Sequence, residues 1–227
     1  MGVDSITEIT DLGFSKGTIV ETIVTTYNVD GQANAAPMGV TMENSQCIVL
    51  RIYTSSLTYK NLNSKKCGVI NITDDVELFY RTAFKEADTN DKLPQNWFEK
   101  AKIIDAPRLR AADAHIEVAV INIKQFDDER ADVVCDVKNV QASNIFPRAY
   151  CRALFATVEA IVHATRVKVF IAHDDKRKRE QALRLLETIK ECNDIVNRVA
   201  PNSHYSEIMT DLHQRINSWR AKAESLR

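Results

Sequence analysis

Residues 18–73 contain four short runs rich in β-branched and apolar residues, and this stretch limits the fold more than any other part of the chain. The runs span residues 18–27, 33–42, 47–54 and 67–73. β-Branched residues favour extended strands. Asp30 and Gly31 separate the first two runs, and Asp-Gly is typical of a tight hairpin because glycine accepts a positive φ at little cost. The stretch therefore predicts four strands, with the first two antiparallel.

Two further strand-like runs follow at residues 114–126 and 130–140. The acidic tripeptide at residues 127–129 joins them and predicts a second hairpin. A short helix is expected within residues 55–66, with Lys65 and Lys66 beyond its end, and another at 76–84. The polar segment 85–96 predicts a long surface loop. Six strands with mostly short connections favour an antiparallel sheet. Closing that sheet into a barrel would remove its exposed edges.

The pattern changes near Phe146-Pro147, beyond which apolar residues recur with a helical period. The helical runs span residues 148–166, 176–199 and 206–226. We therefore expect two parts, a β-barrel in residues 1–145 and a helical unit in residues 146–227. The helical unit could support the barrel or could be a separate surface for docking a partner, and the residues alone leave both possibilities open.

The return strand of the first hairpin has an unusual composition. It is made mostly of small residues: Asn34, Ala35, Ala36, Pro37, Met38 and Gly39. Proline cannot donate to a ladder of strand hydrogen bonds, so it is rare in central strands. Small residues with a proline and a glycine fit a strand edge against which a flat ligand lies closely. The alternative is a poorly formed edge strand that binds nothing.

A loop rich in hydroxyl groups follows the third strand. Its hydroxyl-bearing residues are Thr54, Ser55, Ser56, Thr58 and Tyr59. Ser55 or Ser56 is the expected N-cap of the short helix that begins here. A helix start offers free N–H groups and the positive end of the helix dipole. With Arg51 nearby, the loop predicts a phosphate site, although a simple capped turn would use the same residues.

A second candidate site lies on the first long helix. Arg152, Glu159 and His163 are spaced by seven and four residues, which places them on one helix face, and Arg166 follows. Glu159 could orient His163 and neutralise Arg152 as a structural cluster. Alternatively the cluster binds a substrate anion, and His163 moves a proton near neutral pH.

Composition excludes several classes of function. The net charge of −1 provides no basic field for nucleic acid or an acidic membrane surface. No apolar run approaches the roughly 18 residues needed to span a bilayer, and the first residues lack the features of a secretory signal. The five cysteines form no CxxC pair and the histidines show no zinc-site spacing. We therefore expect reduced thiols, no metal and a cytoplasmic location.

Four segments together resemble the FMN-binding split-barrel proteins, which include flavin reductases and pyridoxamine phosphate oxidases. They are TIVTTYNVDGQANAAPMGV, TSSLTYKNL, VINITDDVELF and PRAYCRALFATVEAIVHATRV. Within that group the chain is similar to a bacterial and archaeal domain-of-unknown-function family with a helical C-terminal unit. The resemblance implies a mainly β plus α fold class: a six-stranded antiparallel split β-barrel, which would bind FMN, followed by a C-terminal helical unit.

The resemblance also implies where the cofactor would bind. The strand from Asn34 to Val40 would lie along the isoalloxazine ring. Thr54, Ser55, Ser56, Thr58 and Asn61 would hold the phosphate and ribityl chain, with Arg51 as a helper and Tyr59 packed on the cofactor or on the barrel. Leu57 stands where a basic residue is expected, which reduces the charge available to the phosphate.

The implied function is that of an FMN-binding, flavin-reductase-like oxidoreductase. Such proteins are usually homodimers with the flavin at the subunit interface. The family's association with tetrahydromethanopterin-using organisms suggests a pterin substrate, and NAD(P)H is the other candidate electron donor. Arg152, Glu159, His163 and Arg166 are the candidate substrate residues. The alternative is a non-catalytic FMN-binding or sensing module, because no side chain stands out as a required acid or base.

Overall fold

The computed structural model describes residues 8–12, 14, 16, 19–85, 93–142, 152–173 and 175–225. The chain divides into two compact units. The first takes its described residues from Met1–Asp75 and Phe84–Phe146, and the second from Val76–Ala83 and Pro147–Arg227. The second unit therefore includes a short helix from within the range 1–145 that the sequence assigns to the barrel.

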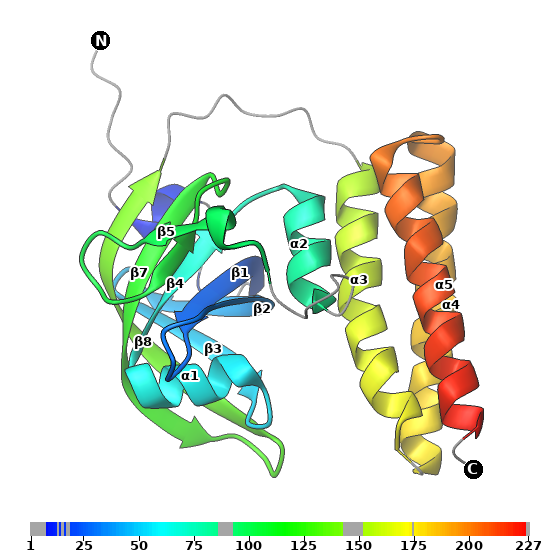
Figure 1. The fold of residues 1–227 in the computed structure, drawn as a ribbon, viewed down its shortest axis with the longest axis horizontal. Coiled ribbons are helices and arrows are strands. Elements are labelled where there is room, and N and C mark those ends of the chain that lie inside the picture. The colour runs from blue at the N-terminus through cyan, green and yellow to red at the C-terminus, as the bar shows by residue number, and fades with distance from the viewer. Residues whose placement is uncertain are drawn as a thin grey trace. The chain divides into compact units, whose positions relative to one another are not determined.

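The first unit is a barrel of six antiparallel strands, as predicted (Figure 1). Around the barrel the strands follow the order β1-β2-β3-β8-β7-β4. Their bounds are β1 Ile19–Tyr27, β2 Ala33–Asn44, β3 Cys47–Tyr53, β4 Cys67–Ile72, β7 Ala114–Gln125 and β8 Arg130–Ala142. Helix α1, Leu57–Lys65, connects β3 to β4, and a 3-10 turn at Ile9–Leu12 precedes β1.

Branched aliphatic side chains fill the barrel. The fully or almost fully buried members of this core include Val24, Val40, Ile48, Leu50, Ile70, Ile116, Val118 and Val133. On β3 the burial alternates along the strand, because successive side chains point to opposite faces. Each such side chain contributes about 1.5–3 kcal/mol when it leaves water.

Side-chain caps fix the two predicted hairpins. Asn28 Oδ1 accepts hydrogen bonds from the backbone N–H groups of Asp30 (3.0 Å) and Gln32 (2.8 Å), and Gly31 has a φ of 76°. Asp127 Oδ1 accepts in the same way from Glu129 (3.0 Å) and Arg130 (2.7 Å). These turns set the register of β1 with β2 and of β7 with β8.

Part of β2 has a strand partner on one side only. This strand pairs with β1 from Ala33 to Thr41, but its pairing with β3 begins only at Val40. The segment from Ala33 to Gly39 is therefore an edge, which is where Pro37 is tolerated. This finding agrees with the edge strand expected from the small residues of this segment.

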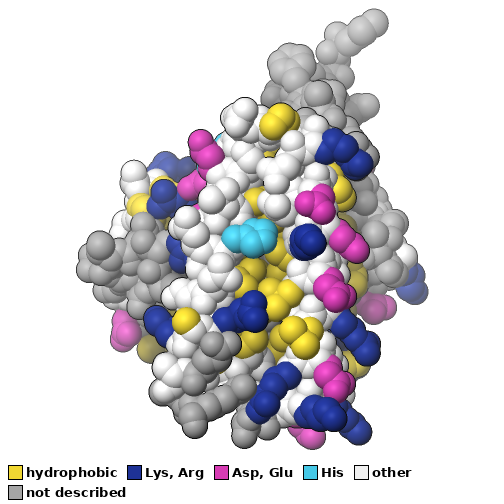
Figure 2. Space-filling model, turned by 90° about the vertical axis from the view of Figure 1, so that its right-hand side faces the viewer, with side chains coloured by type: hydrophobic (Ala, Val, Ile, Leu, Met, Phe, Trp, Pro, Cys, Tyr) yellow, Lys and Arg dark blue, Asp and Glu magenta, His cyan; other side chains and the backbone are white. Residues whose placement is uncertain are grey.

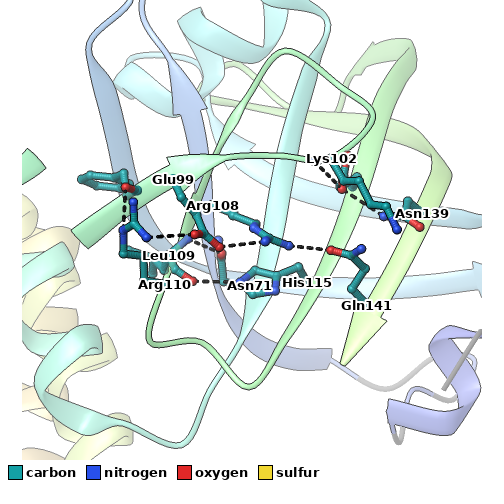
Figure 3. A network of polar contacts seen from close by, with 11 residues as sticks. Asn71, Glu99, Lys102, Arg108, Leu109, Arg110, His115, Asn139 and Gln141 are labelled. Carbon is teal, nitrogen blue, oxygen red and sulfur yellow. Dashed lines mark hydrogen bonds and ion pairs between the residues drawn. The ribbon is translucent and has the colours of Figure 1, made fainter. Parts of the chain in front are cut away.

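A small two-stranded sheet, which the sequence did not predict, packs against the barrel. It is formed by β5 (Phe98–Lys100) and β6 (Pro107–Leu109), and the 3-10 turn Gln95–Trp97 precedes it. Thr25 Oγ1 donates to Pro107 O at 2.6 Å, which ties β6 to β1. Arg108 and Arg110 both form ion pairs with Glu99, at 2.7 Å and 3.0 Å (Figure 3).

The loop between β5 and β6 is held by the buried carboxylate of Glu117. Its oxygens accept hydrogen bonds from the backbone N–H groups of Lys102 (3.0 Å), Ile103 (2.8 Å) and Ile104 (3.0 Å) and from Asn139 Nδ2 (3.0 Å). Burial by itself would raise the pKa of Glu117, but the hydrogen bonds from Asn139 and the loop outweigh burial and lower it. The ionised form therefore stabilises the loop.

The second unit is a helical bundle. It contains α3 (Arg152–Ile171), α4 (Lys176–Val199) and α5 (His204–Ser225), together with α2 (Val76–Ala83). The face of α3 that is buried in the bundle is rich in alanine, including Ala153, Ala160 and Ala164. Figure 2 shows the side of this unit formed by α4 and α5, where hydrophobic side chains are visible between charged ones. Among the described helices, none has both the length and the apolar composition needed to cross a membrane.

Candidate functional site

The first turn of α1 presents backbone donors. Ser56 is the N-cap, one of the two residues expected, and its Oγ accepts a hydrogen bond from the Tyr59 N–H at 3.2 Å. Lys66 ends the helix in the left-handed region with a φ of 57°. Among the described residues, the N–H groups of Leu57 and Thr58 have no partner. They point out of the positive end of the helix dipole, which favours an anion there.

Asn34 links this helix start to the first residues of β2. Its Nδ2 donates to Thr58 Oγ1 at 3.2 Å, and both side chains are buried. The other end of the same amide, Oδ1, accepts a hydrogen bond from Lys85 Nζ. Lys85 is half-buried and lies 51 residues from Asn34 in sequence. We call Asn34, Thr58 and Lys85 the amide cluster.

Asn61 anchors α1 to the barrel wall. Its Nδ2 donates to Thr26 Oγ1 at 2.9 Å, and both residues are buried. Thr26 pairs with Asn34 in the β1–β2 ladder, so this second contact lies next to the amide cluster. The sequence assigned Asn61 to the cofactor, and the structure shows that its amide nitrogen fixes the helix.

Three of the predicted hydroxyl groups can donate to a ligand at the helix start. The hydroxyl oxygens of Ser56 and Thr58 accept hydrogen bonds, which leaves their own protons available, and Ser55 is exposed. The hydroxyl proton of Thr54 is already used in a hydrogen bond, because Thr54 Oγ1 donates to Glu129 O at 3.1 Å. Tyr59 is half-buried and packs against the barrel core.

Arg51 is engaged away from the amide cluster. Its guanidinium forms two hydrogen bonds with the Asp132 carboxylate, at 2.8 Å and 3.0 Å, and lies 3.4 Å from the centroid of the Phe126 ring. The pair with Asp132 raises the pKa of Arg51. Arg51 therefore already has an acidic partner, and its role as a helper at the phosphate stays a prediction. The amide cluster contains a cation of its own, Lys85.

Sequence reasoning did not identify Lys85, because the residue falls in a segment expected to be a surface loop. No motif links Lys85 to Asn34. The available signal is its neighbour Phe84, which is only 1% exposed and fixes the chain just before Lys85.

The edge of β2 offers a surface of mostly small side chains next to the amide cluster. Ala35 is buried, whereas Ala36, Pro37, Met38 and Gly39 are half-buried. At Gly39 an added Cβ would lie 2.8 Å from Ile19 Cγ2, so a larger residue would crowd the strand. Alternate backbone groups from Ala33 to Gly39 point away from β1 and have no pairing with β3, and Met38 O accepts a hydrogen bond from Thr22 Oγ1 at 2.9 Å.

The second candidate site belongs to the helical unit. His163 Nε2 and Glu159 Oε1 are 3.0 Å apart, as the spacing of four residues predicts. Burial lowers the pKa of His163, while the Glu159 carboxylate opposes that shift and Arg166 adds to it. Among the described residues, His163 Nδ1 is buried without a partner. Arg166 is exposed, and the Arg152 side chain lies outside the described atoms. A role for these four residues in substrate binding stays a prediction.

Two family models cover most of the chain. Residues 20–144 match the N-terminal domain of the protein of unknown function family DUF447, and residues 151–214 match the second domain described for that family. The chain belongs to the DUF447 family.

Solved structures include a relative of similar length. An FMN-bound DUF447 protein from Methanosarcina mazei is 23% identical, with 91% of this chain and 98% of that chain covered and a TM-score of 0.70. A 2-nitrobenzoate 2-nitroreductase from Pseudomonas fluorescens is 21% identical over 58% of this chain and 68% of its own, with a TM-score of 0.47. The flavoredoxin of Desulfovibrio vulgaris is 16% identical over 57% of this chain and 76% of its own, with a TM-score of 0.45.

Proposed function

We propose that this chain is an FMN-binding flavoprotein whose cofactor lies between the start of α1 and the open edge of β2. The observation that carries the proposal is the hydrogen bond from Asn34 Nδ2 to Thr58 Oγ1, because it joins those two elements. The FMN bound to the Methanosarcina mazei member of the family supports the same cofactor.

The residues present fit a flavin mononucleotide. A phosphate monoester requires several donors and positive charge. The unpartnered N–H groups of Leu57 and Thr58 and the hydroxyls of Ser55, Ser56 and Thr58 provide the donors. The half-buried edge from Ala36 to Gly39 provides a flat surface with outward backbone groups for the polar rim of an isoalloxazine ring.

Bound FMN would supply hydride or electron transfer, and the protein would bind and orient it. We propose a flavin-reductase-like oxidoreductase of the cytoplasm, reduced by NAD(P)H or acting on a pterin. We also propose a homodimer with the flavin at the subunit interface. The free thiols of Cys47, Cys67, Cys135 and Cys192 support the reducing compartment.

A non-catalytic FMN carrier or sensor is the second candidate. One observation favours it: the groups identified at the helix start are hydroxyls, amides and one ammonium, which bind an anion well and do not form a general acid–base pair. Anaerobic mixing of the FMN-loaded protein with NADH or NADPH, with and without pterins, separates the two candidates. Loss of the flavin's visible absorbance supports the oxidoreductase, and an unreduced flavin supports the carrier.

The binding proposal itself is tested by titrating the purified protein with FMN and following the visible spectrum and flavin fluorescence. We expect wild type to bind FMN at micromolar concentrations and Thr58→Val to bind it about tenfold more weakly, because a hydrogen bond to a charged group contributes about 1.5–3 kcal/mol. Thr41→Val is the matched control, since Thr41 lies on β2 and bonds to Val49 O. Wild type that binds no FMN would refute the proposal.

A further inference from the structure

We propose that Lys85 recognises the phosphate group of the flavin and makes the site selective for phosphorylated over unphosphorylated flavins. This inference rests on the FMN site proposed above and adds to it the residue that determines ligand choice. The sequence suggested that the site lacks charge, because Leu57 occupies the position where a basic residue was expected. The structure supplies a cation from another part of the chain.

The contacts place the Lys85 ammonium beside the helix start. Lys85 Nζ donates to Asn34 Oδ1, and Nδ2 of the same amide donates to Thr58 Oγ1 at 3.2 Å. The ammonium and the Thr58 hydroxyl therefore lie at the two ends of one planar side-chain amide. A phosphate group at the first turn of α1 can reach both. Lys85 has an interaction besides the one with Asn34. An ammonium has three N–H donors, so it can share its donors among several acceptors, including a phosphate oxygen.

Arg51, Lys65 and Lys66 are less suited to this role. Arg51 is held by Asp132 and Phe126. Lys65 lies in the last turn of α1, and Lys66 Nζ donates to Asn63 Oδ1 at 3.0 Å. Both are at the negative end of the helix dipole, away from the first turn.

Burial increases the effect of the Lys85 charge. Asn34, which the ammonium contacts, is only 5% exposed, and Lys85 itself is half-buried, so the ammonium is partly shielded from water. Charges near such surroundings are screened less by solvent and salt than charges on the open surface. Asn34 also fixes the position of the ammonium, which reduces the side-chain entropy lost when a ligand binds.

The test compares FMN with riboflavin, which has the same ring system and no phosphate. Dissociation constants are measured by quenching of flavin fluorescence for wild type, Lys85→Met, Lys85→Arg and the control Lys65→Met, which removes the same charge from the far end of α1. We expect Lys85→Met to weaken FMN binding about tenfold or more, which matches the strength of a charge-assisted hydrogen bond, and to leave riboflavin binding within about twofold. Lys85→Arg should restore most of the preference for FMN.

Two outcomes would overturn the assignment of Lys85. Equal losses of FMN and riboflavin affinity in Lys85→Met would mean that the residue only supports the fold, which far-UV circular dichroism checks independently. A loss of FMN affinity no greater than that of Lys65→Met would mean that the phosphate does not contact Lys85. Addition of sodium chloride should weaken FMN binding by wild type more than binding by Lys85→Met.

A separate measurement distinguishes failure of this inference from failure of the FMN proposal. Thermal unfolding is followed in inorganic phosphate and in sodium chloride of equal ionic strength. Stabilisation of wild type by phosphate, absent in Lys85→Met, supports the role of Lys85 even if wild type does not bind FMN. Equal stabilisation of both proteins overturns it, and wild type that responds to neither FMN nor phosphate overturns both proposals.

Discussion

Asn34 Nδ2 donates a 3.2 Å hydrogen bond to Thr58 Oγ1, and this contact fixes the first turn of α1 against the first residues of β2. Asn34 is therefore both part of the slim strand edge and a support for the helix start. Asn61 repeats the arrangement one turn along the helix through Thr26. The two asparagines hold α1 on the barrel, so the geometry of the candidate site depends on buried polar contacts as well as on the apolar core.

Replacement of Asn61 by alanine should destabilise the barrel. The change removes the 2.9 Å hydrogen bond to Thr26 and leaves the buried Thr26 hydroxyl without that donor. A buried polar group that loses its partner costs about 1–3 kcal/mol. Urea denaturation followed by circular dichroism measures the change. Asn63→Ala is the control, because Asn63 is exposed on the same helix, and equal effects of the two substitutions would contradict the prediction.

Local patterns were sufficient to predict the six strands and most of the helices. The Asp30-Gly31 hairpin, the Ser56 cap and α4 at Lys176–Val199 each depend on neighbouring residues, and the structure places them where their sequence signals indicate. β5 and β6 were not predicted, because three-residue strands show too little alternation. Their position depends on long-range contacts such as Thr25 with Pro107, which no local pattern reveals.

The candidate site was predicted only in part for the same reason. The hydroxyl loop and the slim strand are local features, and the structure brings them together. Arg51 was expected at the phosphate because it is near the loop in sequence, and the sequence did not reveal that its strand also pairs it with Asp132. Lys85 reaches Asn34 from a distant segment. Side-chain partners of this kind depend on the register of the barrel and the path of the loops.

Glu117→Gln should loosen the loop between β5 and β6 and change the pH dependence of stability. The substitution places an amide where the carboxylate accepts from three backbone N–H groups, at a cost of about 1–3 kcal/mol near neutral pH. Because the folded-state pKa of Glu117 lies below its ordinary value of 4.5, the stability it contributes is complete above that value and is lost as pH falls through the folded pKa.

Urea denaturation of wild type and Glu117→Gln over a range of acidic pH values checks this prediction. The difference in unfolding free energy should be largest near neutral pH and should shrink as the pH is lowered. Glu43→Gln serves as the matched control, since Glu43 is exposed on β2. A difference that grows with acidification would show that the ionised form of Glu117 does not stabilise the loop.

His163 should titrate below the ordinary histidine value, and Glu159→Gln should lower its pKa further. Burial disfavours the imidazolium, while the Glu159 carboxylate at 3.0 Å favours it. In the window between the folded pKa and about 6.5 the unfolded chain binds more protons, so the contribution of His163 to stability rises with pH and is complete above that window. A proton NMR titration, with the signal assigned by a His163→Asn variant, measures both pKa values. An upward shift in Glu159→Gln would be inconsistent with the observed pairing.

Truncation before α4 should damage the fold of the remaining chain, because α3 packs against both α4 and α5 and α2 packs against α3. Val76, Leu78 and Phe79 of α2 are buried, and Arg215 of α5 donates to the Tyr80 hydroxyl at 2.5 Å, with its guanidinium 5.3 Å from the ring centroid. Removing α4 and α5 would expose the side of α3 that packs against them, and would remove the Arg215 contact with α2. We therefore expect the truncated protein to aggregate or to bind a hydrophobic dye, as measured by light scattering and dye fluorescence.

A graded version of this experiment compares two leucine-to-alanine substitutions in the helical unit. Leu212 on α5 is 0% exposed, so Leu212→Ala should cost about 2–5 kcal/mol through lost burial and a residual cavity. Leu183 on α4 is 59% exposed, so Leu183→Ala should change stability by no more than about 0.5 kcal/mol. A soluble barrel after truncation, together with equal effects of Leu212→Ala and Leu183→Ala, would favour a tail that is a separable docking unit. Aggregation after truncation, together with a larger effect of Leu212→Ala, would make the tail part of the structural core.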